Sequence, residues 1–123
     1  MATDGDGFVV MHRTEFEHPF PAWWLARRSL GVSAFGLNVA EIAPGETIPE
    51  HDERARDQEE VFAVLEGNAV LVIDGEDHPA PAGTFARIDP DRRRTVRNDG
   101  GAAALVLIMS APRTSGYEPL DWA

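Results

Sequence analysis

Short apolar and β-branched runs alternate along this chain with turn-forming residues, and the pattern predicts strands rather than helices. Turn-forming pairs that contain glycine, such as Pro44-Gly45 and Asp74-Gly75, separate the runs. Strands of this length and spacing are typical of an all-β antiparallel sandwich or barrel. The predicted strands are residues 34–42, 61–65, 69–73, 84–88, 94–97 and 102–109.

The alternation within each run indicates which side chains share a face. In the first run the larger apolar residues are at alternate positions, which is the pattern of a half-buried strand. Residues 23–30 are compatible with either a helical turn or an extended strand. Three groups are expected to share a face: Phe35 with Leu37 and Val39, Glu60 with Phe62 and Val64, and Arg94 with Val96, while Arg93 and Thr95 face outward.

The chain has 123 residues, which is the size of one domain, and no run is long enough to cross a bilayer. We therefore expect a single domain over residues 1–123, with a barrel core at roughly 34–110. The chain contains no cysteine, which excludes disulfides, thiolate metal sites and cysteine nucleophiles. The first ten residues carry two Asp and no basic residue, unlike a secretory signal, so we expect a cytoplasmic protein.

The net charge is −10, from 21 acidic residues against 11 arginines and no lysine. Phosphate backbones and anionic lipids repel such a protein, so we expect neither a nucleic-acid nor a membrane partner. The charge is uneven: residues 41–60 sum to −6, whereas residues 87–97 sum to +3. These two segments are expected to pair in the fold.

Two segments carry the candidate chemistry. In the first, five residues separate Gly45 from His51, Glu53 follows, and six residues separate Glu60 from Gly67. In the second, Gly83, Pro90 and Asn98 frame Arg94. Together they resemble the two motifs of the cupin superfamily, specifically its small single-domain, conserved-barrel members. This resemblance implies a cupin-type antiparallel β-barrel, also described as a double-stranded β-helix or jelly roll.

The resemblance also implies a metal cage, from which this sequence departs. A typical metallocupin uses three His and one Glu to hold iron, manganese, nickel, copper or zinc. Here His51 and Glu60 match, but Glu53 and Arg94 stand where two His are usual, and the spacing from Glu53 to Glu60 is longer by two or three residues. The motif is degenerate.

Arg94 cannot ligate a metal, because a guanidinium group offers only donors and stays protonated. We expect it to compensate the charge of Glu60 where an ion would otherwise do so, and thus little or no tightly bound transition metal. The alternative is a divalent metal (Mn, Fe, Ni or Zn) held by His51, Glu53 and Glu60, whose donors favour manganese or iron over zinc. Whether Glu53 points into the barrel depends on the register of residues 52–59.

Two classes of function remain open. The first is a small cupin that binds an acidic or sugar-like organic ligand in the barrel, at His51, Glu60, Phe62 and Arg94, without a cofactor. The second is a metal-dependent cupin enzyme of the dioxygenase, isomerase or decarboxylase type. The chain lacks nucleotide-binding glycine loops. We further expect a homodimer, which would bury the aromatic residues Trp23, Trp24 and Trp122 of the tails.

Overall fold

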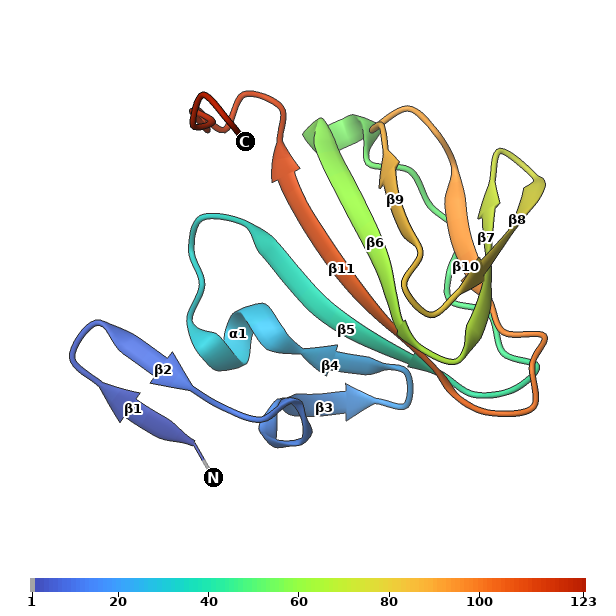
Figure 1. The fold of residues 1–123 in the computed structure, drawn as a ribbon, viewed down its shortest axis with the longest axis horizontal. Coiled ribbons are helices and arrows are strands. Elements are labelled where there is room, and N and C mark those ends of the chain that lie inside the picture. The colour runs from blue at the N-terminus through green and yellow to red at the C-terminus, as the bar shows by residue number, and fades with distance from the viewer. Residues whose placement is uncertain (1) are drawn as a thin grey trace.

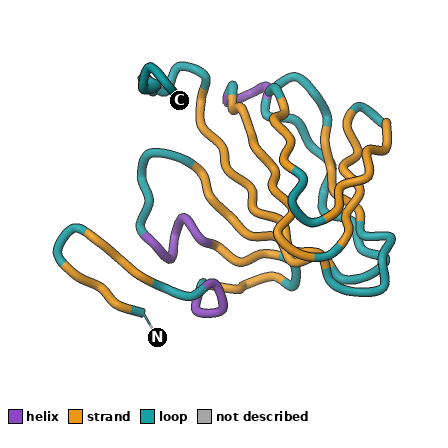
Figure 2. Tube along the Cα trace, in the orientation of Figure 1, coloured by secondary structure: helices purple, strands orange, loops and turns teal. Residues whose placement is uncertain are grey.

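The computed structural model describes residues 2–123, and Figures 1 and 2 show that strands dominate it. Two antiparallel sheets form the barrel. The larger has the strand order β3-β4-β5-β11-β6-β9, and the smaller has the order β10-β7-β8. The large sheet comprises β3 (Glu17–Phe20), β4 (Trp23–Leu25), β5 (Gly36–Ile42), β11 (Ala104–Pro112), β6 (Gln58–Glu66) and β9 (Phe85–Ile88). The small sheet comprises β10 (Arg94–Arg97), β7 (Asn68–Ile73) and β8 (Glu76–Pro81).

The remaining elements are short. A separate hairpin of β1 (Thr3–Gly5) and β2 (Phe8–Val10) precedes the barrel. The helical elements are η1 (Arg13–Glu15), α1 (Ala26–Leu30) and η2 (Arg54–Arg56). None of the helices in residues 2–123 is long and apolar enough to cross a membrane.

The core lies between the two sheets. β6 contributes Phe62 and Val64, β11 contributes Val106 and β10 contributes Val96, each with no more than 1% of its surface exposed. The shared inward face of Glu60, Phe62 and Val64 is therefore confirmed, because all three are buried.

All six predicted strands are present; four further strands, β1, β2, β3 and β8, were not predicted. Of these, β8 belongs to the barrel and contains Pro79 and Pro81, residues that argue against a strand. It pairs only with β7, and an edge position tolerates prolines because no further strand needs their missing N–H groups. The turn before β8 was predicted correctly: Asp74 and Gly75 both have positive φ, as a two-residue hairpin turn requires.

Three details differ from the sequence-based expectation. In β5 the core side chains are Ala40 and Ile42, whereas Val39 is buried but lies outside the core cluster, on a strand that α1 also contacts. Phe35 precedes β5 and is 39% exposed. Thr95 is buried rather than outward, since segment 47–51 covers β10 and the Thr95 hydroxyl donates to the Ile48 carbonyl.

The prediction that all three tryptophans are exposed tail residues is wrong for two of them. Residues 23–30 form both alternatives in succession, strand β4 and then α1, and β4 joins the large sheet. Trp23 packs against the core cluster. Trp24 donates to Glu41 (Nε1–Oε1, 3.0 Å) and stacks on His18. Trp122 alone of the three is strongly exposed, at 85%.

Candidate functional site

The two charged segments identified in the sequence meet at one end of the barrel. The loop after β5 runs antiparallel to β10, and the backbones of His51 and Arg94 exchange two hydrogen bonds, of 3.1 and 2.8 Å. Glu60 enters from β6, where it is paired in register with Ile88 of β9. The predicted pairing of the −6 and +3 segments is confirmed by the ion pairs of Arg93 with Glu50 and Arg94 with Glu60.

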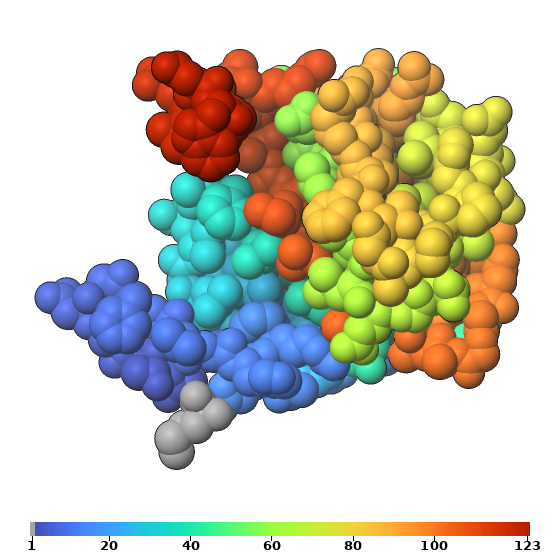
Figure 3. All heavy atoms as spheres, in the orientation of Figure 1, coloured from blue at the N-terminus to red at the C-terminus, as the bar shows by residue number. Residues whose placement is uncertain are grey.

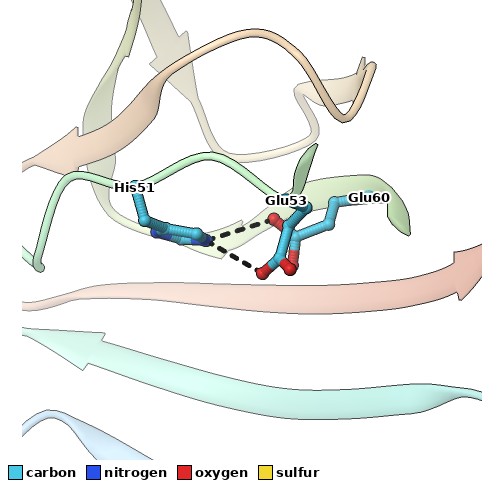
Figure 4. Close-up of side chains that lie close together, drawn as sticks. All are labelled: His51, Glu53 and Glu60. Carbon is cyan, nitrogen blue, oxygen red and sulfur yellow. Dashed lines mark ion pairs between the residues drawn. The ribbon is translucent and has the colours of Figure 1, made fainter. Parts of the chain in front are cut away.

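His51, Glu53 and Glu60 form a cluster, which we call the His-Glu triad (Figure 4). One ligand atom from each lies within 4.8 Å of the others. Nε2 of His51 is 3.4 Å from Oε1 of Glu53 and 3.5 Å from Oε1 of Glu60. The side chains of Glu53 and Glu60 are only 11% and 7% exposed, whereas that of His51 is 37% exposed. Water therefore reaches the triad from the His51 side.

The imidazole of His51 is oriented by its own loop. Its Nδ1–H donates to the carbonyl of Pro49 at 3.2 Å, because a carbonyl oxygen can only accept. This bond turns Nε2 toward both carboxylates. The carboxylate of Glu60 is the main cause that raises the pKa of His51; the Pro49 carbonyl and Glu53 act in the same direction and burial opposes them.

Glu53 points into the site because the additional residues of the motif fold into a compact turn. After Glu53 the chain forms η2, and Asp57 then adopts a left-handed conformation with φ of 50°. The Gln58 N–H donates back to the Glu53 carbonyl at 3.3 Å, and the Glu53 N–H donates to the Pro90 carbonyl at 3.0 Å. These bonds hold the backbone of Glu53 against the β9–β10 loop, which answers the question of register that the sequence left open.

Three arginines hold this loop in place, of which the sequence analysis named only Arg93. Arg113, at the end of β11, bonds the Asp57 carboxylate at 2.6 Å. Arg54 donates to the Asp91 carbonyl at 3.0 Å, and Arg93 pairs with Glu50 at 3.0 Å. The charge asymmetry of the sequence pointed to the contacts between residues 41–60 and 87–97, but not to that of Arg113, which lies outside both segments.

Arg94 lies beneath the triad with 0% of its surface exposed. Its Nη2 donates to the carbonyls of Ile88 (3.3 Å) and Asp89 (2.8 Å), and its Nε is 3.7 Å from Oε1 of Glu60. It therefore links the small sheet to β9 and β6 of the large one. Among the described residues, Nε and Nη1 of Arg94 and Oε1 of Glu60 have no hydrogen-bond partner.

The other motif residues have structural positions. Phe62 lies in the core with 0% exposure, on the same face of β6 as Glu60. Asn98, also fully buried, donates to the carbonyls of Ile42 and Ala102. At Gly67 a side chain would meet the Ala103 carbonyl oxygen at 2.6 Å, which explains a glycine after β6.

Known structures share this architecture. A cupin protein from Bacteroides fragilis matches with a TM-score of 0.78 and 20% identity, over 94% of this chain and 92% of that one. A sugar phosphate isomerase from a cupin superfamily, from Silicibacter pomeroyi, matches with a TM-score of 0.69 and 22% identity, over 83% and 74%. A predicted oxalate decarboxylase from Thermotoga maritima matches with a TM-score of 0.62 and 19% identity, over 73% and 76%. At these identities the likeness shows the fold.

The comparison with curated proteins found no match. The family model described as "Cupin domain" matches residues 38–110, more than half of the chain and almost the whole of the barrel core expected from the sequence. The match includes both motif segments and every residue of the His-Glu triad. This chain belongs to the cupin domain family.

Proposed function

We propose that this cupin domain binds a hard divalent cation at His51, Glu53 and Glu60, and that the bound cation takes a small, oxygen-rich organic ligand. The observation that carries the proposal is the environment of Oε1 of Glu60. It is a buried carboxylate oxygen without a hydrogen bond from the described residues, and it lies 3.5 Å from Nε2 of His51 and 3.7 Å from Nε of Arg94, its ion-pair partner. Buried polar atoms nearly always form hydrogen bonds or bind an ion, so this oxygen is able to take a closer partner.

The charge of the site fits a cation. A cage of three neutral His and one Glu carries a formal charge of −1. Here Glu53 adds one negative charge and Arg94 adds one positive charge, so the site with neutral His51 also carries −1. The two departures from the family motif therefore compensate one another. Arg94 alone argues against a metal, but Arg94 and Glu53 together do not.

The donor set defines the class of ion. Two carboxylates and one imidazole suit manganese or iron(II) better than zinc or copper. The Pro49 carbonyl would orient the His51 ligand, as hydrogen-bonded groups around metal centres commonly do. When bound, the cation would act as a Lewis acid and polarise an oxygen of the ligand.

The organic ligand is proposed to be a hydroxy acid or a sugar-like molecule. Two structural neighbours are described as a sugar phosphate isomerase and a predicted oxalate decarboxylase, and both names refer to small, oxygen-rich molecules. Such molecules chelate hard cations through paired oxygens. We extend this substrate class to the present chain as part of the proposal, with a metal-dependent enzyme as the corresponding activity.

A second candidate function is supported by Arg94. Two of its buried N–H groups, on Nε and Nη1, lack an acceptor among the described residues. An organic ligand that reached them would be held without a metal, which is the first class of function expected from the sequence. However, these atoms have almost no accessible surface, so such a ligand would need the loop to move. Binding of a single ion between His51 and Glu60 requires less movement of the loop than binding of an organic ligand at Arg94.

Metal titration distinguishes the two candidates. The chain is stripped with a chelator, and binding of Mn²⁺ is followed by calorimetry and by electron paramagnetic resonance. We expect about one ion per chain, and an affinity more than about tenfold weaker in Glu60→Gln. Glu59→Gln is the matched control, because Glu59 is the neighbouring residue and faces the opposite side of β6. Equal Mn²⁺ binding by wild type and Glu60→Gln would contradict the proposal.

A ligand screen then tests the second candidate. Thermal unfolding is recorded with simple sugars and hydroxy acids, in chelator and in Mn²⁺. The proposal predicts stabilisation only when Mn²⁺ is present. Stabilisation in chelator that is lost in Arg94→Met would instead establish metal-free binding.

A further inference from the structure

The residues that lengthen the first motif also bring an exposed arginine to the His-Glu triad. Arg56 ends η2, the short green helical turn that precedes β6 in Figure 1. Its Nη2 lies 3.4 Å from Oε2 of Glu53, and 76% of its side chain is exposed. The N-terminal hairpin (blue) and the C-terminal segment (dark red) extend away from the barrel in Figure 3. Arg56 therefore contacts the triad from the solvent.

Glu53 connects Arg56 to the rest of the triad through a single carboxylate group. Its Oε1 is 3.4 Å from Nε2 of His51, whereas its Oε2 accepts a hydrogen bond from Arg56. At 3.4 Å this bond is longer than the spacing of about 2.7–2.9 Å that is typical of charge-assisted hydrogen bonds. An exposed ion pair of this kind contributes little stability. The guanidinium of Arg56 can therefore exchange Glu53 for another acceptor at little cost.

The other charged side chains of residues 50–57 have partners outside the triad. These partners are Arg93 for Glu50, the Arg54 N–H for Asp52, the Asp91 carbonyl for Arg54, and Arg113 for Asp57. Two arginines pair with a triad carboxylate among the described residues. Arg94 is fully buried, so Arg56 is the one that a ligand can reach from the solvent.

A guanidinium beside a cation site selects for negative charge. It offers only N–H donors, in a planar array that matches the oxygens of a carboxylate or a phosphate. The hydroxyl groups of a neutral sugar accept weaker hydrogen bonds, because they carry no charge. When Glu53 ligates a cation, its carboxylate shares its negative charge with that cation and holds Arg56 less strongly. The donors of Arg56 are then available to the anionic group of a ligand.

We infer that Arg56 determines the ligand specificity of this site, and that it selects ligands in which a carboxylate or phosphate group accompanies the oxygens that chelate the cation. The inference rests on the proposed function, because it requires a cation at the His-Glu triad. It narrows the ligand class from hydroxy acids and sugar-like molecules to the anionic ones among them. It also differs from the expectation based on the sequence, which assigned the contact with the ligand to the buried Arg94.

Calorimetry on the Mn²⁺-loaded full chain, freed of excess metal, tests this inference with matched probes. Lactate is compared with propane-1,2-diol, in which a hydroxymethyl group replaces the carboxylate, and glucose 6-phosphate is compared with glucose. We expect wild type to bind at least one anion more tightly than its neutral counterpart. Arg56→Met should lower the affinity for that anion by about tenfold, the effect of losing a hydrogen bond to a charged group, and should leave the neutral probes unaffected.

The affinity for Mn²⁺ itself separates a binding role of Arg56 from a structural one. Arg56→Met removes a positive charge from beside Glu53, so it should bind Mn²⁺ at least as tightly as wild type, whereas a disturbed loop would bind it more weakly. Arg56→Lys keeps the charge and should keep part of the affinity for the anion. Arg28→Met is the matched control, because Arg28 is also exposed and pairs with Glu17 at 3.3 Å, but lies on α1.

The outcomes distinguish this inference from the proposed function. If wild type binds no Mn²⁺, the proposed function is wrong and the inference fails with it. The inference alone is overturned if Mn²⁺ binds but neither anion is preferred over its neutral counterpart, or if Arg56→Met leaves the affinity for the anion unchanged or weakens Mn²⁺ binding as well. A preference for lactate would identify a carboxylate ligand and a preference for glucose 6-phosphate a phosphate ligand, and either supports the inference.

Discussion

Two arginines of β10, three residues apart, illustrate opposite kinds of ion pair. Arg97 is 32% exposed and lies 2.8 Å from a carboxylate oxygen of Asp77 and 2.7 Å from one of Asp99. Arg94 is fully buried, and its nearest carboxylate oxygen, on Glu60, is 3.7 Å away. The better geometry thus belongs to the exposed pair. Breaking the buried pair is nevertheless expected to cost more stability than breaking the exposed pair, because water can replace a partner at the surface but not in the interior.

Loss of Arg94 is expected to have the largest effect on stability. In Arg94→Met the buried carboxylate of Glu60 loses its cation, and the carbonyls of Ile88 and Asp89 lose their donor. Breaking a buried pair in this way costs on the order of 3 kcal/mol, the lower end of the usual range, since the triad is open to water on the His51 side. Urea unfolding in the presence of chelator measures the loss.

A double variant separates the ion pair from packing. Combining Arg94→Met with Glu60→Gln removes both charges, so no buried charge remains unpaired, and much of the lost stability should return. If Arg94→Met leaves the unfolding midpoint unchanged, or if the second substitution worsens the loss, then Arg94 does not compensate Glu60.

The sequence predicted the buried pair but not the loop above it, and the reason is physical. Strand periodicity before Gly67 fixed the inward face of Glu60, and the charge asymmetry indicated a basic partner on residues 87–97. Both are local patterns. The orientation of Glu53 depends on the left-handed Asp57, which Arg113 holds from a position 56 residues further along the chain. A contact of that range leaves no periodic signal.

The missed features of the fold have similar causes. β8 lacks the β-branched residues that indicate a strand, and its prolines are tolerated only because it is an edge, which the sequence does not reveal. Trp24 was expected at an interface, yet it is partly buried by His18 and Glu41, both more than five residues away in the chain. Tertiary partners decide these cases, whereas local pattern decides the central strands.

The intermediate effect concerns His51, which is itself 37% exposed but pairs with the buried carboxylate of Glu60. The Glu60 carboxylate raises the pKa of His51 above its ordinary value of about 6.5. A raised pKa means that the protonated ring stabilises the fold. This stabilisation is fully present below the ordinary pKa and is lost as the pH rises through the folded pKa.

The stability difference between wild type and His51→Gln in chelator should therefore shrink as the pH rises above about 6.5, the ordinary pKa of a histidine. Urea unfolding across this range measures it. His78→Gln is the control, because His78 is exposed on β8 and its ion-pair partner Glu76, at 3.9 Å, is exposed as well. A difference that stayed constant with pH, or one that the His78 variant reproduced, would show that His51 and Glu60 are not coupled.

The smallest effect is expected at Arg97, despite its short contacts. Arg97 lowers the pKa of Asp77 and of Asp99, so its pairing contributes stability at neutral pH that is lost as the pH falls through their folded pKa values. Because these groups are exposed, Arg97→Met should lower the unfolding midpoint far less than Arg94→Met does.

The dependence of both costs on salt provides the decisive measurement. At about 1 M NaCl the screening length falls to about 3 Å, so the cost of Arg97→Met should nearly vanish, while that of Arg94→Met persists. If both costs fell together with salt, the two arginines would share one solvent environment, and the distinction between the buried and the exposed pair would be lost.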